Sequence, residues 1–288
     1  MKYNGIITPM LTPFNHKGEI DYSSIDTLVK YLKSIGVSGI FPSSSTGLFP
    51  FLSTNERKKM LERVLENSGS IKVFAGIGAA DTDSSINLAK HARDVGANGV
   101  VLMPSYYITS SQEWIINHFE KVLKAVDIDL IIYNNPKTTG TNIELKTLEH
   151  LKSNYSQVLG IKDSTGDMRY FERLLFLKDS NFSVFQGEDD LMFISLMIGA
   201  DGGVCAISNF SEDVVNLYNS YTSDDLEKTR TLQKRINGMM DILLLSNFPA
   251  MFYYAFYRKF NIKGGYRDPM VRPSKKVAEK ILDFIKVV

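Results

Sequence analysis

The sequence predicts an α/β fold, a (β/α)8 TIM barrel with a C-terminal helical extension. Eight short apolar runs start 21 to 33 residues apart, a spacing that suits strand–loop–helix units. Each run is followed by a polar turn and then by a segment of helical periodicity. Eight such units in about 210 residues, without a linker or a break in composition, favour a single barrel over two smaller sheets.

The predicted strands are rich in β-branched residues and show no polar alternation. Such strands have both faces covered, as in a barrel or a doubly wound sheet. They span residues 5–11, 38–43, 71–76, 98–103, 129–134, 158–163, 182–187 and 203–208.

Helical patterns fill the segments between these strands. An apolar stripe runs from Ile25 to Leu32, and Gly36 follows it as a helix stop. Ser53 and Glu56 have the spacing of a capping box ahead of a second apolar stripe. After Phe210 the pattern is wholly helical, over 211–260 and 273–287. We therefore expect a barrel over residues 1–220 and a helical extension packed on it over 221–288.

The composition excludes several classes of function. The chain has 288 residues, 33 Lys and Arg against 32 Asp and Glu, and no basic stripe, so nothing favours nucleic-acid binding. The N-terminus lacks the apolar run of a signal peptide, and no apolar run approaches the ~18 residues of a membrane span. The single cysteine, Cys205, allows no internal disulfide, and the four histidines lack metal-ligand spacing. The sequence predicts a soluble cytoplasmic protein without a metal, a membrane partner or a nucleic-acid partner.

Polar side chains gather where the predicted strands end. In a barrel of this kind the active site lies at the C-terminal ends of the strands. Those ends carry hydroxyls, phenols, an amine and an amide, in Ser43–Gly47, Pro104–Tyr107, Tyr133–Pro136, Lys162, Gly187–Asp189 and Ser208–Asn209. Each alone has a structural explanation: a Ser-rich turn, packing aromatics, or a lysine that reaches water from the barrel mouth. Their placement on one rim favours a catalytic site.

Lys162 is the most informative of these residues. It ends the apolar strand 158–163, where loss of hydration penalises a charged side chain. A purely structural strand gains nothing from a lysine there. A lysine that attacks a carbonyl as a neutral amine requires such a position.

The motifs YNNP (133–136) and GIKDS (160–164), with the STG turn (45–47), resemble those of the dihydrodipicolinate synthase/N-acetylneuraminate lyase family. The resemblance covers the chain from residue 7 to the C-terminal helices. It is greatest to the archaeal 2-keto-3-deoxygluconate aldolases, through Ser45–Leu48, Pro104–Tyr107 and the run 199–209. The resemblance implies a (β/α)8 class I aldolase that handles pyruvate.

The resemblance also implies a covalent mechanism without metal or cofactor. Lys162 would form an imine with the keto carbon of pyruvate or of a 2-keto-3-deoxy sugar acid, and the protonated imine would draw electrons from the breaking C3–C4 bond. Tyr133 would shuttle protons, including that of the C4 hydroxyl. Thr46 would relay this proton toward Tyr107, supplied by the neighbouring subunit in a homotetramer built as a dimer of dimers.

The same resemblance assigns residues to substrate binding. The backbone N–H groups of the Ser45–Thr46 turn would hold the pyruvyl carboxylate without an arginine. The full set implied for substrate binding is Ser45, Thr46, Asn135, Ser164, Gly187, Glu188, Asp189 and Ala206.

The expected activity is reversible cleavage of 2-keto-3-deoxygluconate to pyruvate and glyceraldehyde. The rival within the family is dihydrodipicolinate synthase, which joins pyruvate to aspartate semialdehyde. Family synthases carry an arginine where this chain has Thr138, and usually a glutamate where it has Leu48, so both departures argue against the synthase. N-acetylneuraminate lyase stays open. A catalytically silent pyruvate-binding barrel is disfavoured, because it would not need the four implied catalytic residues intact.

The chain also departs from aldolases that accept a phosphorylated sugar acid. The resemblance implies that these hold the phosphate with an arginine after the tyrosine pair and with a tyrosine two residues after Tyr133. Here Thr109 and Asn135 are found instead. We therefore expect a preference for the non-phosphorylated substrate, with Lys137 as the cation that would compensate if it turned inward.

Overall fold

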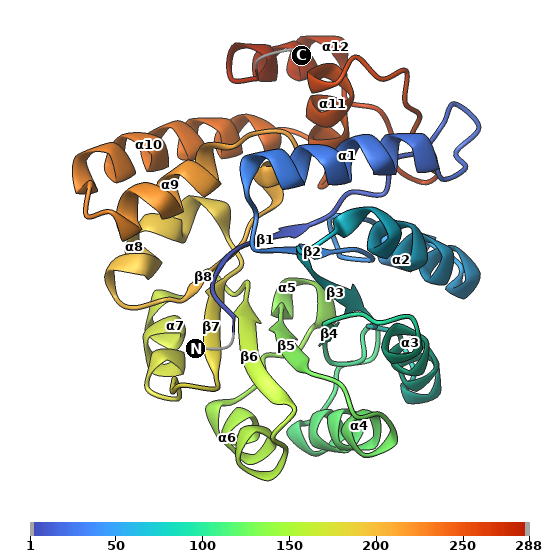
Figure 1. The fold of residues 1–288 in the computed structure, drawn as a ribbon, viewed down its shortest axis with the longest axis vertical. Helices are drawn as coiled ribbons and strands as arrows, with labels where there is room; N and C mark the ends of the chain where they lie inside the picture. Colours follow the sequence, from blue (N-terminus) through green and yellow to red (C-terminus); the bar gives the residue numbers. More distant parts are fainter. Residues whose placement is uncertain (1–2, 286–288) are drawn as a thin grey trace. The chain divides into compact units, whose positions relative to one another are not determined.

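The computed structural model describes residues 3–285 and confirms the predicted fold class. Eight strands follow one another in chain order in a closed barrel, surrounded by helices (Figure 1). The strands are β1 (Gly5–Pro9), β2 (Gly39–Phe41), β3 (Lys72–Gly76), β4 (Gly99–Leu102), β5 (Leu130–Asn134), β6 (Val158–Asp163), β7 (Ser183–Gln186) and β8 (Gly202–Val204).

The helices alternate with these strands and then continue without further strands. They are α1 (Tyr22–Ile35), α2 (Thr54–Ser68), α3 (Thr82–Asp94), α4 (Gln112–Ala125), α5 (Pro136–Thr139), α6 (Leu145–Asn154), α7 (Met168–Leu175), α8 (Met192–Met197), α9 (Asp213–Thr222), α10 (Leu226–Leu243), α11 (Ala250–Lys259) and α12 (Lys275–Ala278). Short 3-10 turns are η1 (Phe49–Phe51), η2 (Asp189–Leu191), η3 (Ala206–Asn209) and η4 (Glu279–Asp283).

The chain divides into two compact units. The first contains residues 72–204 together with the N-terminal segment through Gly5, and the second contains residues 6–71 and the chain from Cys205 onward. The expected boundary at residue 220 stays a prediction.

In the first unit, β3 to β8 pair in parallel. The register places Tyr133 of β5 beside Lys162 of β6, and Lys162 beside Phe185 of β7. β5 and β6 are buried along their whole length. This burial explains the near-continuous apolar runs, because side chains on both faces of these strands are covered.

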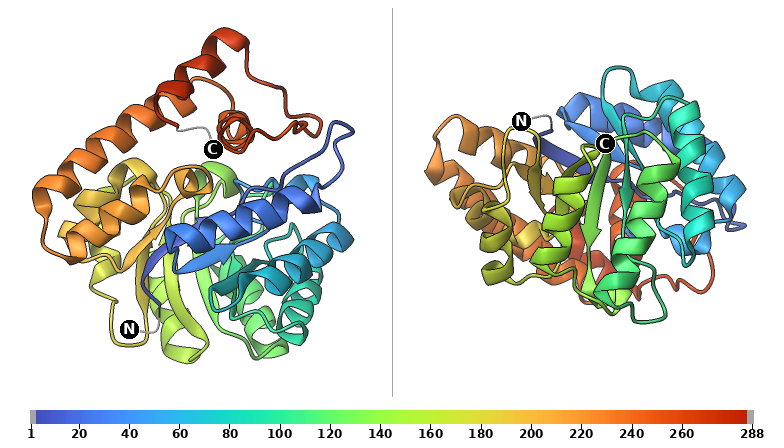
Figure 2. Two further views of the ribbon diagram at one scale, coloured as in Figure 1. Left: turned by 45° about the horizontal axis from the view of Figure 1, so that its top comes forward. Right: turned by 90° about the horizontal axis from the view of Figure 1, so that it is seen from below.

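In the second unit, β1 pairs with β2, and the predicted helix signals are confirmed. Gly36 ends α1 with a left-handed backbone (φ 76°), a conformation that glycine adopts without steric cost. Ser53 and Glu56 form the capping box of α2. Helices α9 and α10 lie side by side, as both views in Figure 2 also show.

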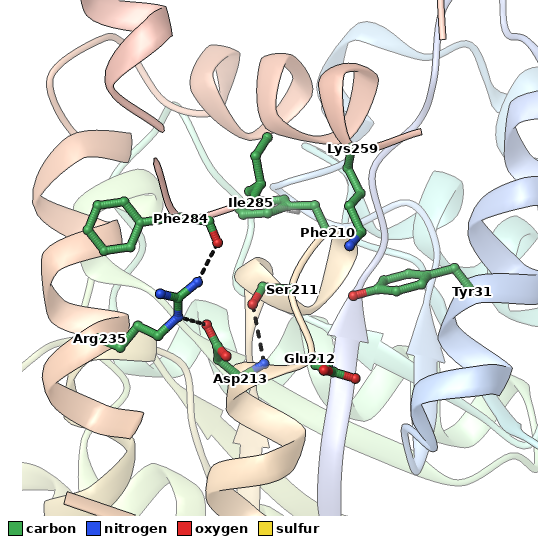
Figure 3. A pocket seen from close by; sticks show the side chains of 9 residues that line it. All are labelled: Tyr31, Phe210, Ser211, Glu212, Asp213, Arg235, Lys259, Phe284 and Ile285. Atoms are coloured by element: carbon green, nitrogen blue, oxygen red, sulfur yellow. Dashed lines mark hydrogen bonds and ion pairs between the residues drawn. The ribbon is translucent and has the colours of Figure 1, made fainter. Parts of the chain in front are cut away.

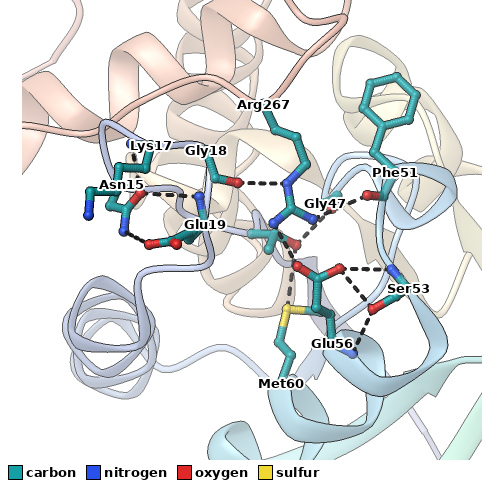
Figure 4. A network of polar contacts seen from close by, with 11 residues as sticks. Asn15, Lys17, Gly18, Glu19, Gly47, Phe51, Ser53, Glu56, Met60 and Arg267 are labelled. Atoms are coloured by element: carbon teal, nitrogen blue, oxygen red, sulfur yellow. Dashed lines mark hydrogen bonds and ion pairs between the residues drawn. The ribbon is translucent and has the colours of Figure 1, made fainter.

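Arg267 connects three segments of the second unit (Figure 4). Its guanidinium donates to the backbone oxygens of Gly18 (2.8 Å) and Phe51 (3.2 Å) and pairs with Glu56 (2.6 Å), which also belongs to the capping box. It lies 4.6 Å from the centre of the Phe14 ring. One arginine therefore fixes the loop before α1 and the start of α2 to the chain that follows α11.

The eighth strand is shorter than predicted. Residues 203–208 were expected to be extended, but β8 ends at Val204 and Ala206–Asn209 forms η3. Side chains explain the difference, because Asn209 Nδ2 donates to the backbone oxygens of Pro9 (3.1 Å) and Ala206 (2.8 Å). Such side-chain bonds to the backbone compete with a strand ladder.

The C-terminal helical pattern is interrupted where a continuous run was expected. Turns at 223–225 and 244–249 separate α9, α10 and α11. Within the predicted segment 273–287, α12 and η4 together reach only Asp283, and residues 286–287 lie outside the described part of the chain.

Candidate active site

Lys162 and Tyr133 are direct neighbours at the C-terminal ends of β6 and β5. Both are buried, with 5% and 4% of their surface exposed. Lys162 Nζ lies 4.0 Å from the centre of the Tyr133 ring. A primary amine beside a phenol suits imine chemistry, because the phenol can give and take protons near the atom that the amine attacks.

Asn135 positions the phenol. Its Nδ2 donates to Tyr133 Oη (2.9 Å), so the phenol oxygen acts as the acceptor in this bond. Asn135 Oδ1 is buried and has no hydrogen-bond partner among residues 3–285. A buried amide oxygen without a partner costs free energy, and a hydroxyl of a bound ligand would satisfy it.

Gly187 makes room for the lysine. A Cβ added at this position would lie 3.0 Å from Lys162 Cε and 2.7 Å from the Asp163 backbone oxygen, and it would overlap Ser164 Oγ. The backbone N–H of Gly187 donates to that same Asp163 oxygen (2.7 Å). The glycine therefore lets β7 close against β6 while the lysine side chain passes between them.

Asp163 is buried directly after Lys162 and supports the strand end. Its carboxylate accepts hydrogen bonds from Asn134 Nδ2 (2.8 Å) and Thr165 Oγ1 (2.6 Å). Burial raises the pKa of Asp163 to about 6, although these two hydrogen bonds act in the opposite direction. Asn134 Oδ1 also accepts from the backbone N–H of Ile143 (3.1 Å), so the ends of β5 and β6 and the loop after α5 are joined.

The loop after β7 is held by a side chain that sequence reasoning missed. Gln186 Oε1 accepts from the backbone N–H groups of Gly187 and Glu188 (2.9 Å each), and its Nε2 donates to Ser195 Oγ (2.7 Å). Of the residues expected to bind substrate here, Glu188 pairs with Lys137 (2.9 Å) and Asp189 is buried. The available signal in the sequence was a glutamine at the end of the predicted strand that contains Val184 and Phe185.

Ser164, also expected to bind substrate, is buried directly after the end of β6. Its backbone N–H donates to the Asn134 oxygen (2.9 Å), which extends the pairing of β5 and β6 by one residue.

Tyr107 behaves differently from the other predicted catalytic residues. It follows β4, its side chain is 93% exposed, and its backbone is left-handed (φ 78°). For a residue other than glycine this conformation is strained and needs support from its surroundings. Within the first unit, the structure therefore does not fold Tyr107 inward.

The predicted carboxylate-binding turn is in the second unit. Thr46 is buried, and Ser45 Oγ is a buried atom without a hydrogen-bond partner in the described chain. Ser44 Oγ accepts from the backbone N–H of Gly47 (2.9 Å), and Ser43 is left-handed (φ 56°). The turn is thus tightly wound, and one of its hydroxyls still lacks a partner. Ala206, also expected to bind substrate, is buried at the start of η3.

A second support that sequence reasoning missed holds this turn from α11. Thr12 Oγ1 donates to the Gly47 oxygen (2.7 Å), and the backbone N–H of Thr12 donates to Tyr253 Oη (3.2 Å). Tyr257, one helical turn further on, accepts from the backbone N–H of Phe14 (2.9 Å). The available signal was the i, i+4 spacing of Tyr253 and Tyr257 in the aromatic-rich helix α11.

A cavity of about 330 Å³ occurs elsewhere in the second unit (Figure 3). Arg235 pairs there with Asp213 (2.9 Å) and donates to the Phe284 oxygen (2.5 Å). The other lining residues are Tyr31, Phe210, Ser211, Glu212, Lys259 and Ile285. No residue predicted for the active site lines this cavity, and Arg235 serves to join α10, α9 and the end of η4.

Residues 3–285 contain neither a candidate metal site nor a membrane-spanning helix. No group of three or more His, Cys, Asp and Glu side chains could hold a metal ion in that range. Over the same range, no helix has both the length and the apolar character needed to cross a membrane.

The chain is similar in sequence to known proteins over nearly its whole length. A model of the dihydrodipicolinate synthetase family matches residues 2–288. An uncharacterized DapA-like lyase of Thermoplasma acidophilum is 47% identical over 280 residues, which cover 97% of this chain and 96% of that protein. A 2-dehydro-3-deoxy-D-gluconate/2-dehydro-3-deoxy-phosphogluconate aldolase of Picrophilus torridus is 43% identical over 263 residues, 91% of this chain and 98% of the relative.

Solved structures are similar over nearly the whole chain. The 2-keto 3-deoxygluconate aldolase from Picrophilus torridus superposes with a TM-score of 0.92 at 43% identity, covering 94% of this chain and 98% of the other. A prophage protein of the dihydrodipicolinic acid synthase family from E. coli K12, solved in complex with pyruvate, gives a TM-score of 0.93 at 25% identity and covers 99% of both chains. Since a family model and close relatives both span the chain, this protein belongs to the dihydrodipicolinate synthetase family of pyruvate-dependent class I lyases.

Proposed function

We propose that the protein is a Schiff-base aldolase that reversibly cleaves 2-keto-3-deoxygluconate to pyruvate and glyceraldehyde. The observation that supports this most is the buried pair of Lys162 and Tyr133, whose amine and ring centre are 4.0 Å apart. The Picrophilus torridus relative is named as an aldolase of both 2-dehydro-3-deoxy-D-gluconate and 2-dehydro-3-deoxy-phosphogluconate, which supports this class of substrate.

In the proposed reaction Lys162 Nζ adds to the C2 carbonyl carbon, and water leaves to give a protonated imine. Tyr133 gives its phenol proton to the departing water as the imine forms, and the resulting phenolate accepts the proton of the C4 hydroxyl as the C3–C4 bond breaks. The bonding electrons move onto the imine and form an enamine, while C4 becomes the aldehyde of glyceraldehyde. Protonation at C3 and addition of water then release pyruvate and the free amine.

The remaining implied roles form part of the same proposal. The backbone N–H groups at Ser45 and Thr46 bind the pyruvyl carboxylate, and the unsatisfied Ser45 hydroxyl supports an anion there. Thr46 relays the C4 proton toward Tyr107. The exposed position of Tyr107 suits a residue that acts in a neighbouring subunit.

Thr138 supports the aldolase over the synthase. Its Oγ1 donates to the Asn135 backbone oxygen (3.1 Å), so the position at which family synthases carry an arginine presents neither a cation nor a hydroxyl donor to a ligand. A carboxylate-bearing aldehyde such as aspartate semialdehyde would therefore lack its charge-assisted contact.

We also propose a homotetramer assembled as a dimer of dimers. Exposed apolar side chains occur in two parts of the first unit, around the start of α4 (Tyr107, Ile108, Trp114) and at the end of α7 and on α8 (Phe176, Ile194, Met197). Apolar groups that gather on a surface in this way are typical of contacts between subunits. A monomer that is fully active, shown by light scattering on the assayed sample, would contradict the shared site.

Borohydride reduction in the presence of pyruvate tests the proposed chemistry. A reduced pyruvyl imine adds about 72 Da to the intact mass, and peptide mapping should place the adduct on Lys162. Lys137→Ala, which removes another lysine of the same unit, serves as the matched control and should retain the adduct. An adduct on a different lysine, or none at all, would refute the role given to Lys162.

A further inference from the structure

Lys137 and Glu188 form an ion pair between loops that flank Lys162. Lys137 begins α5 after β5, and Glu188 follows β7; the two side chains meet at 2.9 Å. Lys137 Nζ also lies 3.8 Å from the point that a Cβ on Gly166 would occupy, in the loop after β6. The pair therefore connects the loops at the ends of three consecutive strands, and Lys162 is on the middle strand.

Glu188 is adjacent in sequence to Gly187, the residue that packs against Lys162 Cε. A sugar acid joined to Lys162 through C2 must direct its far end, C5 and C6, away from the strand and toward these loops. The charges that the loops present there decide whether a phosphate on C6 is tolerated.

If α5 is counted as part of the connection from β5 to α6, Lys137 is the single lysine or arginine in the segments that join β3 to β7 to the helices that follow them. A phosphate that used Lys137 would have to separate it from Glu188 and would then face the Glu188 carboxylate. Lys137 is 62% exposed, so water screens the pair and separating it costs little. The carboxylate is only 26% exposed, and its repulsion of a dianion is the larger effect.

We propose that Glu188 determines selectivity against phosphorylated sugar acids, both by occupying Lys137 and by placing its own charge where a C6 phosphate would lie. This inference rests on the proposed function. The sequence argument rested on a missing arginine at the position of Thr109. This inference instead assigns the discrimination against phosphorylated substrates to a charge that is present, the Glu188 carboxylate.

The test compares kcat/KM for 2-keto-3-deoxygluconate and its 6-phosphate in four proteins: wild type, Glu188→Gln, Asp190→Asn and the double variant Glu188→Gln/Lys137→Met. Glu188→Gln should raise the ratio of phosphorylated to non-phosphorylated kcat/KM about five- to tenfold. High salt should reduce that gain. The double variant should keep the larger part of this gain, because the carboxylate is missing there too, and should lose only the part that comes from the released ammonium.

Asp190→Asn is the matched control, because it removes the same charge from the same loop and leaves the Lys137–Glu188 pair intact. Its ratio should stay within about twofold of wild type. An equal rise of the kcat/KM ratio in Asp190→Asn would mean that net charge alone sets the ratio, which contradicts a specific role for Glu188. An unchanged ratio in Glu188→Gln would also overturn the proposal.

A second measurement separates this proposal from the proposed function. Inorganic phosphate should bind more tightly to Glu188→Gln than to wild type when both carry the borohydride-trapped pyruvyl adduct, as measured by calorimetry, and this experiment needs no sugar acid. If wild type traps pyruvate but cleaves neither sugar acid, the aldolase assignment fails while the phosphate experiment still decides the role of Glu188. Equal phosphate affinity of the two proteins would overturn it.

Discussion

The hydroxyl of Tyr253 on α11 accepts a hydrogen bond from the buried backbone N–H of Thr12, whose own hydroxyl donates to Gly47 at the end of the Ser45–Thr46 turn. A residue late in the chain thus supports a turn near its start. In this pair of hydrogen bonds, Thr12 is the link between Tyr253 and the turn.

Tyr253→Phe should therefore weaken pyruvate binding without removing a group that touches substrate. Thr12 N–H would be left buried without its acceptor, at a cost of about 1–3 kcal/mol in unfolding free energy. Displacement of the turn should raise KM for pyruvate roughly tenfold, with a smaller change in kcat. Tyr257→Phe is the control, because it removes the hydroxyl that accepts from the backbone N–H of Phe14. It should lower stability and leave KM for pyruvate unchanged. Equal effects on KM would argue for a general loss of packing.

Lys162→Ala should abolish the borohydride-trapped adduct and the turnover while the protein stays folded. The substitution removes an amine and an alkyl stem but leaves the backbone pairing of β6 intact. Circular dichroism and gel filtration check the fold, and intact mass checks the adduct. Near-native turnover in this variant would mean that the nucleophile is elsewhere.

Tyr133→Phe should separate proton transfer from imine formation. The ring beside Lys162 is retained, and only the hydroxyl held by Asn135 is lost. We expect turnover to fall ~10²–10⁴-fold, the usual contribution of general acid–base catalysis. Trapping of pyruvate should be affected less than cleavage of the sugar acid. A proton-transfer role would be contradicted by equal losses in the two assays.

Gly187→Ala should damage the site through one methyl group. The added Cβ would lie 3.0 Å from Lys162 Cε, closer than such contacts normally occur, and it would overlap Ser164 Oγ. Either β7 or the lysine must move, so the rate of pyruvate trapping should fall about 100-fold. Gly96→Ala, where the backbone is left-handed (φ 87°) and no atom lies within 4 Å, is the control. It should cost about 1 kcal/mol in stability and leave trapping unchanged.

Asp163→Asn should alter how stability depends on pH. Burial raises the Asp163 pKa from its ordinary 3.8 to about 6, so the folded protein holds this proton more tightly than the unfolded chain. Its contribution to stability is therefore fully present below about pH 4 and is lost as pH rises through about 6, a change of roughly 3 kcal/mol. Denaturant unfolding between pH 4 and 7 should show wild type losing stability relative to the variant. Parallel curves for the two proteins would mean that the carboxyl titrates normally.

The sequence predicted the strands and the Lys162–Tyr133 pair because both depend on local patterns. Apolar runs define the strands, and parallel strands next to each other bring their C-terminal ends together. The partners of Asn209 and Tyr253 were not predictable in this way, since they lie 200 and 241 residues away in sequence. The length of β8 was overestimated for the same reason, because Asn209 decides it through contacts with Pro9.

The exposed Tyr107 marks another limit. Its sequence neighbours give no reason for a left-handed backbone, and the first unit provides no covering for its ring. The role proposed for Tyr107 depends on contacts between subunits, and such contacts are not encoded in the local sequence pattern.

The hydrogen bond between Thr12 and Tyr253 also bears on how the protein is made. A ribosome releases residues 45–47 long before residue 253, so the turn emerges without the α11 hydroxyl that supports it through Thr12. Chains that stop early, or that are cut between α10 and α11, would retain Lys162 and Tyr133 but lack this support. The turn proposed to bind the carboxylate therefore acquires its support from α11 only at the end of synthesis.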